Sequence, residues 1–261
     1  MKRIPAVALR EISSLFVSPV AYGVLTLYTL LAGFFFLLGV VGFLETLRQA
    51  QAFQAFDYLA QMNLNDALIT PFLGSMSVVL IFVIPGVTMG LFASEKANGT
   101  DELLLTSPLT IWDIVLGKYL AVAIFVLLLG LLVGFFPAVL FRYGDPEVGK
   151  TLAGLLGLVL TGLAYAAVGC FASSVTRSQM IAFILAFVIL LLLLIMGAVA
   201  ELGAMGNAAW LEGFLGYLSV GEHFENLSKG LVDTVDLSYF FVVMATGLLL
   251  TKAAVETARW R

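Results

Sequence analysis

Six long stretches of the chain are almost free of Asp, Glu, Lys and Arg, and each is long enough to cross a membrane as a helix. Such a helix needs about 20 predominantly apolar residues. Charged residues make up 11% of the chain and hydrophobic residues 61%, whereas about 25% of residues in a soluble domain are charged. The sequence therefore predicts an all-α polytopic membrane protein, with a single transmembrane domain over residues 1–261. The predicted spans are about 19–44, 71–94, 119–141, 151–176, 178–200 and 237–258.

The segment before the first span has a different pattern. Residues 4–18 alternate apolar and polar side chains at helical spacing before Pro19, which favours an amphipathic helix lying in the membrane interface. The first apolar run reaches Leu44. It is longer than the apolar core of a signal peptide, about 7–15 residues, and no small-residue cleavage site follows it. We therefore expect an uncleaved membrane anchor.

Lysine and arginine predict the orientation, because they are enriched in cytoplasmic segments. Six spans place the N-terminus, the 94–118 loop, the 174–179 turn and the C-terminus on one side. That side would carry nine basic residues and the other side four (Arg48, Arg142, Lys150 and Lys229). We expect both termini in the cytoplasm of a multi-pass cell-membrane protein.

Two segments on the other side of the membrane differ from ordinary loops. Residues 45–70 form a Gln-rich stretch that would either be a loop or extend the first span as a helix. Residues 201–236 are too apolar for a solvated loop and carry several aromatic side chains. Two short re-entrant helices that dip into the outer leaflet would fit this second segment, because such backbone must be buried in protein or line a cavity.

Small residues recur at four-residue spacing in three spans. The patterns are Gly86-x-x-x-Gly90, Gly130-x-x-x-Gly134 and Gly162-x-x-x-Ala166-x-x-x-Cys170. Such spacing allows two helices to approach closely. We favour packing within the chain over contact between two copies, and the second interpretation stays open.

Ionisable groups are lacking at the centre of every predicted span. Proton- and sodium-driven carriers use such groups at depth, so the sequence argues strongly against that class. It argues less strongly against an intramembrane enzyme. His223 with Glu222 and Glu225 is too crowded for a metal site, and a hydrogen-bonded interfacial histidine is the better interpretation. The sequence therefore predicts no catalytic residue and no metal ligand.

Residues 144–151, GDPEVGKT, match the P-loop pattern for nucleotide binding. A P-loop requires a buried strand before it and a nucleotide-binding domain around it, but here a predicted span lies on each side. The predicted orientation also places the motif outside the cell. We interpret the match as coincidence, and we expect Lys150 and Thr151 to bind no nucleotide.

The segment after the second predicted span carries the most specific signal. It is polar at first, continues as Asp101-Glu102-Leu103-Leu104-Leu105, and is interrupted at Pro108. Thr110 with Asp113 three residues later is a short version of a capping box, which predicts that a new helix begins there. The segment is thus predicted to form a short helix, a proline break and a helix that feeds the third span. The leucines would pack on a partner, on the chain's own spans or in the lipid interface.

Residues 84–121 resemble the corresponding loop of ABC-2 type transporter permeases. The branch with gliding-motility and copper-enzyme-maturation permeases is most similar. The pattern falls on Pro85, Glu95, Gly99, Thr100, Glu102, Leu103, Leu104, Leu105, Pro108, Gly117, Lys118 and Tyr119. Residues 223–240 also resemble the segment before the last span of that branch. Gly90 and Ser94 depart from the pattern, in which Arg and a second Glu are frequent.

The resemblance implies a permease subunit of an ATP-driven exporter. In similar proteins this loop is a coupling helix that sits in a groove of a separate cytoplasmic ATPase, which binds the ATP and Mg²⁺. This chain would then have no cofactor and no catalytic site of its own. The implied partners are that ATPase, a second permease (the same chain or a related one), an accessory membrane protein and membrane lipid, with no nucleic acid. The implied location is a bacterial cell membrane.

The coupling residues implied by the resemblance are Glu95, Lys96, Gly99, Thr100, Asp101, Glu102, Leu103, Leu104, Leu105 and Pro108. An alternative is a membrane anchor for an ATPase complex that acts in motility or signalling. The substrate is left open among lipid, polysaccharide and hydrophobic drug.

Overall fold

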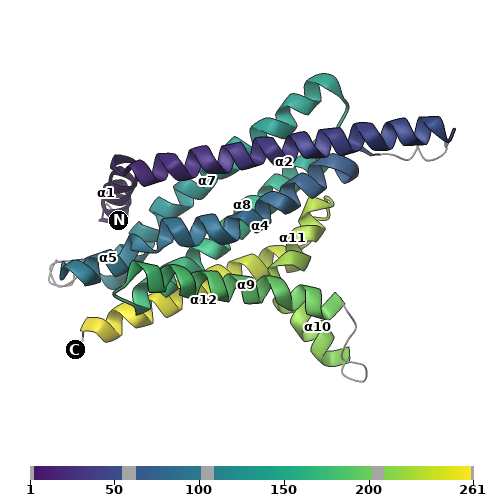
Figure 1. Ribbon diagram of the computed structural model, residues 1–261. Coiled ribbons are helices and arrows are strands. Elements are labelled where there is room, and N and C mark those ends of the chain that lie inside the picture. Colours follow the sequence, from purple (N-terminus) through teal and green to yellow (C-terminus); the bar gives the residue numbers. More distant parts are fainter. Residues whose placement is uncertain (1–2, 55–62, 101–108, 202–208, 260–261) are drawn as a thin grey trace.

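A computed structural model describes residues 3–54, 63–100, 109–201 and 209–259, and these residues form helices joined by short connections (Figure 1). Within those ranges there is no β-strand. The helices are α1 (Arg3–Val17), α2 (Pro19–Ala52), the π-helical turn η1 (Asn65–Ile69), α4 (Thr70–Thr88), α5 (Gly90–Asn98), α7 (Ile111–Tyr143), α8 (Val148–Val175), α9 (Gln179–Glu201), α10 (Ala209–Leu218), α11 (Val220–Ser228) and α12 (Thr234–Arg259).

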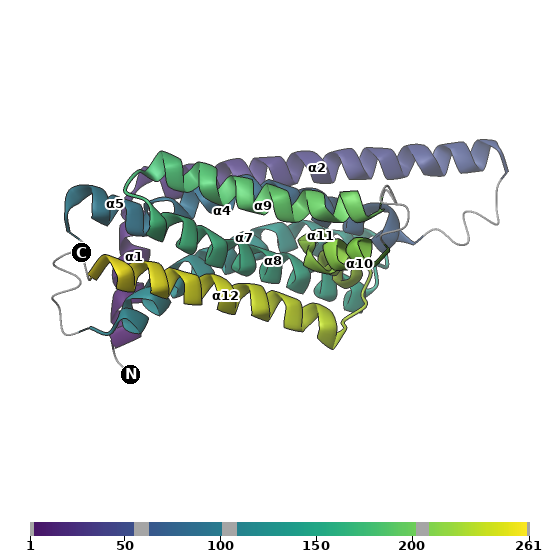
Figure 2. The same cartoon turned by 90° about the horizontal axis from the view of Figure 1, so that it is seen from below.

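In the described part of the chain, six helices are long and apolar enough to cross a membrane, which confirms the predicted all-α, six-span architecture. The helices are longer than the apolar stretches that predicted them. The first continues as α2 to Ala52, so residues 45–52 extend the span as a helix. Two ends of the bundle can be distinguished (Figure 2). The terminal end holds α1, α5 and the last turn of α12, and the distal end holds α10, α11 and the turn between α7 and α8.

Helix α8 is the centre of the bundle. In its most apolar window 67% of residues are buried inside the chain, against 11% in α2 and 17% in α9. Small residues on α8 and α7 explain this position. A Cβ added at Gly130 would lie 2.7 Å from Val159, and one added at Gly162 would lie 2.7 Å from Val126. The second and third small-residue patterns therefore serve packing within the chain, as the sequence analysis favoured.

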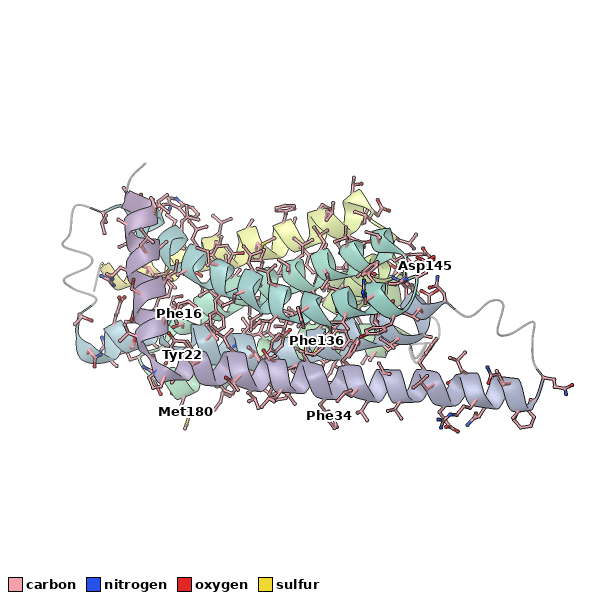
Figure 3. The ribbon with its side chains drawn as sticks, turned by 90° about the horizontal axis from the view of Figure 1, so that it is seen from above. Phe16, Tyr22, Phe34, Phe136, Asp145 and Met180 are labelled. Carbon is pink, nitrogen blue, oxygen red and sulfur yellow. The ribbon has the colours of Figure 1, made fainter. Side chains whose placement is uncertain are left out.

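Helix α2 lies at the edge of the bundle and continues past the other helices at the distal end (Figures 1 and 2). Its 34 residues correspond to about 50 Å at 1.5 Å per residue, against a hydrocarbon core of about 30 Å. Figure 3 shows Phe34 pointing away from the bundle, whereas Phe136 of α7 lies on the side of α2 that is packed. One face of α2 is thus covered by protein, and the other carries exposed apolar side chains.

Helix α1 crosses the terminal end of the bundle roughly at right angles to α2 (Figures 2 and 3). Ser18 separates the two helices, and its hydroxyl accepts a hydrogen bond from the backbone N–H of Val20 (3.3 Å). Val7 and Ala8 are buried, while Leu9 and Val17 on other faces are exposed. The predicted N-terminal helix is present, and its direction across the end of the bundle suits a membrane interface.

Two short helices, α10 and α11, precede the last long helix, as the sequence predicted for residues 201–236. His223 of α11 is buried between them and α12. Its Nδ1 lies 2.6 Å from Oδ1 of Asp236, and its Nε2 lies 3.0 Å from the backbone oxygen of Tyr217. His223 also stacks on Tyr239. The expected hydrogen-bonded histidine is confirmed, and its partner is Asp236 rather than the neighbouring glutamates.

Candidate functional site

The loop that carries the resemblance begins at a break in the second long helix. Pro85 lies inside α4, and the helix ends three residues later at Thr88, with Met89 between α4 and α5. Ser173 of α8 stabilises the break, because its hydroxyl accepts the backbone N–H groups of Phe92 (3.0 Å) and Ala93 (3.1 Å) and donates to the backbone oxygen of Met89 (2.9 Å). These bonds fix the direction in which α5 leaves the bundle.

Helix α5 carries the first predicted site residues, Glu95 and Lys96. It ends at Gly99, which adopts a left-handed backbone conformation (φ 68°) that glycine accepts without a side-chain clash. The backbone N–H of Thr100 donates to the oxygen of Glu95 (3.0 Å) and completes the cap. The remaining predicted residues, Asp101, Glu102, Leu103, Leu104, Leu105 and Pro108, lie outside the described residues, as does the short helix predicted there.

The chain re-enters the bundle through a capping box. Thr110 Oγ1 accepts the backbone N–H of Asp113 (3.2 Å), and Asp113 Oδ2 accepts the backbone N–H of Thr110 (3.0 Å). The predicted start of the helix that feeds the third span is therefore confirmed. Both attachments of the intervening segment are anchored, one by the glycine cap of α5 and the other by the capping box of α7.

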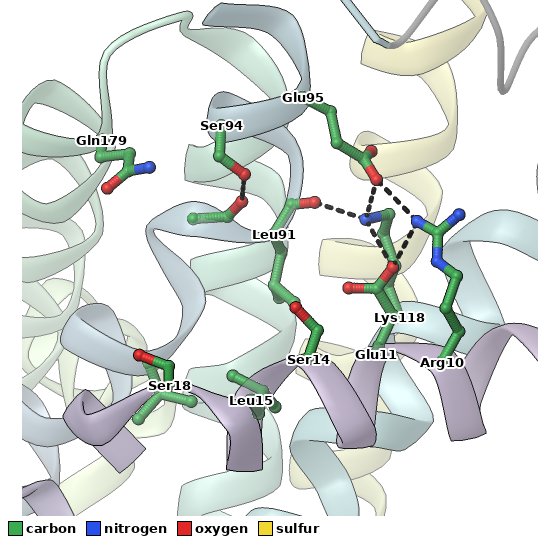
Figure 4. Close-up of a pocket in the computed structure, with 12 residues that line it drawn as sticks. Arg10, Glu11, Ser14, Leu15, Ser18, Leu91, Ser94, Glu95, Lys118 and Gln179 are labelled. Atoms are coloured by element: carbon green, nitrogen blue, oxygen red, sulfur yellow. Dashed lines mark hydrogen bonds and ion pairs between the residues drawn. The ribbon is translucent and has the colours of Figure 1, made fainter. Parts of the chain in front are cut away.

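A buried lysine on α7 links α5 to α1 at the terminal end (Figure 4). The side chain of Lys118, in the second turn of α7, is 1% exposed. Its Nζ lies 2.9 Å from Oε1 of Glu95 on α5 and 3.2 Å from Oε1 of Glu11 on α1, and it donates to the backbone oxygen of Leu91 (2.6 Å). A buried ammonium is costly unless it is paired, and these three acceptors use its three donors.

Arg10 completes the group. Its Nη2 lies 2.9 Å from Oε1 of Glu11 and 3.0 Å from Oε1 of Glu95, while its side chain stays 60% exposed. We call Arg10, Glu11, Glu95 and Lys118 the terminal charge cluster. It carries two positive and two negative charges, so it is neutral as a set. Because its members come from α1, α5 and α7, a displacement of α5 must move or break contacts to both other helices.

Lys96 makes a second connection, from α5 to the end of α8. Its Nζ donates to the backbone oxygen of Ser174, one of the carbonyl groups that the end of α8 leaves free for such a bond. Cations are favourable at this position of a helix because of its dipole. The two charged residues of α5 in the predicted site are therefore tied to different helices.

Close packing at Gly117 seats α1 beside this cluster. A Cβ added there would lie 2.6 Å from Cβ and Cγ1 of Val7 and 3.2 Å from the backbone oxygen of Ile4. The Gly-Lys pair of the family pattern thus has two roles. Glycine lets α1 approach α7, and lysine binds Glu11 on that helix.

Substitution of Gly117 by Ala is expected to weaken the seating of α1. Overpacking of a filled site typically costs about 1–3 kcal/mol, and here the contact includes backbone as well as the Val7 side chain. We expect faster proteolysis of the N-terminal helix in the purified protein. Gly23→Ala is the control, since a Cβ at Gly23 meets no atom within 4 Å. Equal proteolysis rates for the two variants would contradict this packing.

The P-loop-like residues lie at the distal end, in the turn that joins α7 to α8, so a helix and not a strand precedes them. Lys150 Nζ lies 3.3 Å from Oε1 of Glu147 and 3.5 Å from Oδ2 of Asp66. Thr151 Oγ1 accepts a hydrogen bond from Nδ2 of Asn65 (3.0 Å). The lysine and threonine of the motif thus serve to attach η1 to α8.

The resemblance implied Glu95 as a coupling residue and Lys118 only as a position of the pattern, and sequence reasoning missed Arg10 and Glu11 as functional candidates. A signal was available. Arg10 and Glu11 are adjacent charges in the middle of a helix whose other residues, apart from Arg3 at its start, are apolar or serine. Lys118 is flanked by Gly117 and Tyr119 at the start of a long span. Opposite charges at such positions require partners when they are buried.

Comparisons with known proteins identify the family of the chain. A family model described as "ABC-2 family transporter protein" matches residues 6–255. Over 141 residues the chain is 32% identical to the "Probable multidrug ABC transporter permease YbhR" of Escherichia coli strain K12, and it has the same similarity to the protein of that name in Escherichia coli O157:H7. The match covers 52% of this chain but only 36% of the length of each relative. The family match spans nearly all of the residues that build the bundle and the terminal charge cluster, and the chain therefore belongs to the ABC-2 family of transporter proteins.

Proposed function

We propose that the chain is the membrane-spanning permease subunit of an ATP-binding-cassette exporter, and that the segment from Glu95 to Pro108 contacts a separate cytoplasmic ATPase. The observation that carries this proposal is the terminal charge cluster. It links α5, which leads into the segment, to α1 and α7 through a lysine that is 1% exposed. A partner that moves the segment would therefore move three helices together.

The proposed mechanism uses this link as a lever. ATP binding to the partner would displace the segment between its two anchored attachments at Gly99 and Thr110. The displacement would reach α7 directly through its capping box, and α1 through Glu11 and Lys118. Rigid-body motion of packed helices is an established way in which a local binding event changes the shape of a path through a protein. In this scheme the ATPase binds ATP and Mg²⁺, and the present chain binds neither.

A dimer of permeases would complete the unit. Helices α2 and α9 are the least buried of the six long helices, so they have apolar faces available for lipid or a second permease. For the cargo, the similarity to permeases described as multidrug favours a small hydrophobic molecule over a polysaccharide. The resemblance to the gliding-motility and copper-enzyme-maturation branch remains a prediction.

The terminal end is proposed to face the cytoplasm, since nine of the chain's basic residues belong to the segments on that side. A cysteine in place of Tyr143, which is 84% exposed at the distal end, should react with a membrane-impermeant maleimide in intact cells. The native Cys170 is buried and supplies an unreactive background. Labelling that requires broken cells would reverse the proposed orientation.

The proposed function is tested by purifying the tagged chain from its native membrane in mild detergent and measuring ATP hydrolysis. We expect a second subunit to copurify with the chain and to hydrolyse ATP in a vanadate-sensitive manner. In sealed inverted membrane vesicles, the assembled complex should move a hydrophobic dye inward when ATP is added. ATP hydrolysis without movement of any tested cargo would favour the anchor of a motility or signalling complex. Absence of ATP hydrolysis from preparations that remain assembled would contradict the proposal.

A further inference from the structure

Two adjoining cavities lie at the terminal end, where the helices do not pack closely against one another. The first has a volume of about 380 Å³, and its lining residues include Arg10, Ser14 and Ser94 (Figure 4). The second, of about 170 Å³, lies between α2 and α4 and is lined by Val20, Val24, Gly86 and Phe125. They share the lining residues Leu15, Ser18, Val87, Gly90 and Gln179. They thus form one continuous groove.

The groove changes from polar to apolar along its length. Its first part contains the terminal charge cluster and the side chains of Ser14, Ser18, Ser94 and Gln179. Its second part is lined mainly by aliphatic side chains, glycine and Phe125. Gly86 and Gly90 line this second part, and a Cβ added at Gly90 would lie 4.0 Å from Nε2 of Gln179, which lines both cavities. The first small-residue pattern therefore lines a cavity, unlike the two patterns that pack helices.

The direction of this change matches a lipid in a membrane. The polar part lies where α1 crosses the end of the bundle, and the apolar part continues along α2 and α4, two helices long enough to cross the membrane. An interfacial helix lies at the level of the headgroups, and acyl chains run alongside the spans. A lipid could therefore place its headgroup by α1 and its first acyl carbons between α2 and α4 without leaving its leaflet.

The charges favour a headgroup that itself carries both signs. The exposed guanidinium of Arg10 can bind a phosphate, and the hydroxyl group of Ser14 lies one helical turn away on the same helix and also lines the cavity. Within the described part of the chain, the ion pairs of Glu11 and Glu95 run through their Oε1 atoms, so their Oε2 atoms can accept from an ammonium group. A headgroup that carries a phosphate but no ammonium group would place its negative charge beside the carboxylates of Glu11 and Glu95 without a compensating positive charge of its own. We propose that this groove binds a phospholipid with an amine–phosphate headgroup, such as phosphatidylethanolamine.

The proposal is tested on the purified full chain by native mass spectrometry after exchange into detergent that contains equal amounts of phosphatidylethanolamine and phosphatidylglycerol. We expect retained phosphatidylethanolamine to exceed phosphatidylglycerol about tenfold or more, the effect of one charge-assisted hydrogen bond. Soluble phosphoethanolamine should not compete at equal concentration, because it lacks the acyl part that fills the second cavity. Displacement by the soluble compound would identify the site as one for the free headgroup and would overturn the lipid assignment.

Filling the groove should abolish this preference. Gly90→Leu adds a side chain where both cavities are lined, next to Gln179, and Val24→Trp enlarges a side chain that lines the apolar cavity alone. Gly23→Leu is the matched control, because this glycine is next to Val24 on α2 but lines neither cavity, and a Cβ added there meets no atom within 4 Å. We expect about a tenfold loss of bound phosphatidylethanolamine in both groove variants and none in the control. Equal retention in all three variants, or a preference for phosphatidylglycerol in the unsubstituted chain, would overturn the proposal whether or not a groove variant folds poorly.

Discussion

Replacing Lys118 with Met is expected to destabilise the terminal end by about 3–5 kcal/mol, the usual cost of breaking a buried ion pair by removing one partner. Met has a similar length but no charge, so it would leave Glu11 and Glu95 together with Arg10 as their only remaining cation in the cluster. The Glu11 and Glu95 side chains are 11% and 17% exposed, too little for water to compensate. The midpoint of thermal unfolding in mild detergent, followed by tryptophan fluorescence, should fall clearly.

The matched control is Lys252→Met. Lys252 lies on α12 and pairs with Glu256 one turn later at 3.5 Å, but its side chain is 34% exposed. Exposed pairs of this kind contribute about 0.3–0.5 kcal/mol. The Lys252 ammonium also lies 5.7 Å from the centre of the Trp112 ring, a contact worth about 0.5–1 kcal/mol at an exposed site, so this variant should lose much less stability than Lys118→Met. If the two variants lose the same stability, the burial of Lys118 has no energetic consequence and the cluster is not a structural link.

A second comparison separates stability from coupling. In the triple variant Glu11→Gln, Glu95→Gln, Lys118→Met, the four-charge cluster retains only Arg10, which is 60% exposed and can be hydrated. Replacement of all buried charges is often neutral, so much of the lost stability should return. The ion pairs between α1, α5 and α7 would remain absent. We therefore expect the triple variant to fold and to transport poorly, whereas recovery of full transport would show that packing alone transmits the motion.

The sequence predicted the spans well because a bilayer imposes a length and a composition that are local properties of the chain. The capping box was also predictable, since Thr110 and Asp113 are three positions apart and satisfy each other's backbone. The charge cluster was not, because Glu11 and Lys118 are separated by 107 positions and their meeting depends on how α1 folds over the bundle. Nor could the pattern Gly86-x-x-x-Gly90 distinguish a packed face from the wall of a cavity, since both require a missing side chain.

The same difference between local and long-range contacts applies to the proposed coupling segment between Gly99 and Thr110. Gly99 and Thr110 follow from local rules of helix capping, and they show where the segment leaves and re-enters the bundle. The contacts of Glu102 would belong to another protein, so neither the sequence nor the fold of this chain can identify them. The interaction has to be tested by changing the charge at that position while leaving both attachments and the terminal charge cluster intact.

Glu102→Lys is expected to release the proposed ATPase. A carboxylate in a partner's groove accepts charge-assisted hydrogen bonds from basic groups, and a lysine there would place like charges together and leave the partner's cation unpaired. Truncation of a buried charged pair at an interface costs about 2–5 kcal/mol, and at 1.4 kcal/mol per factor of ten this corresponds to about thirtyfold or more in affinity. Insertion into the membrane should be unaffected, because the substitution leaves the sequence of the six long helices in the described residues unchanged. The readouts are the amount of ATPase that copurifies in mild detergent and the rate of transport.

Asp145→Lys supplies the matched charge reversal, since Asp145 is an exposed acidic residue at the distal end, whereas α5 lies at the terminal end (Figure 3). It makes the same change in net charge, so a general effect of charge on assembly would appear in both variants. We expect the Asp145 variant to retain its ATPase and the Glu102 variant to lose it. A Glu102→Lys protein that copurifies with a normal amount of ATPase and transports at the full rate would show that this segment is not the coupling element. The terminal charge cluster would then stabilise the bundle without transmitting motion from a partner.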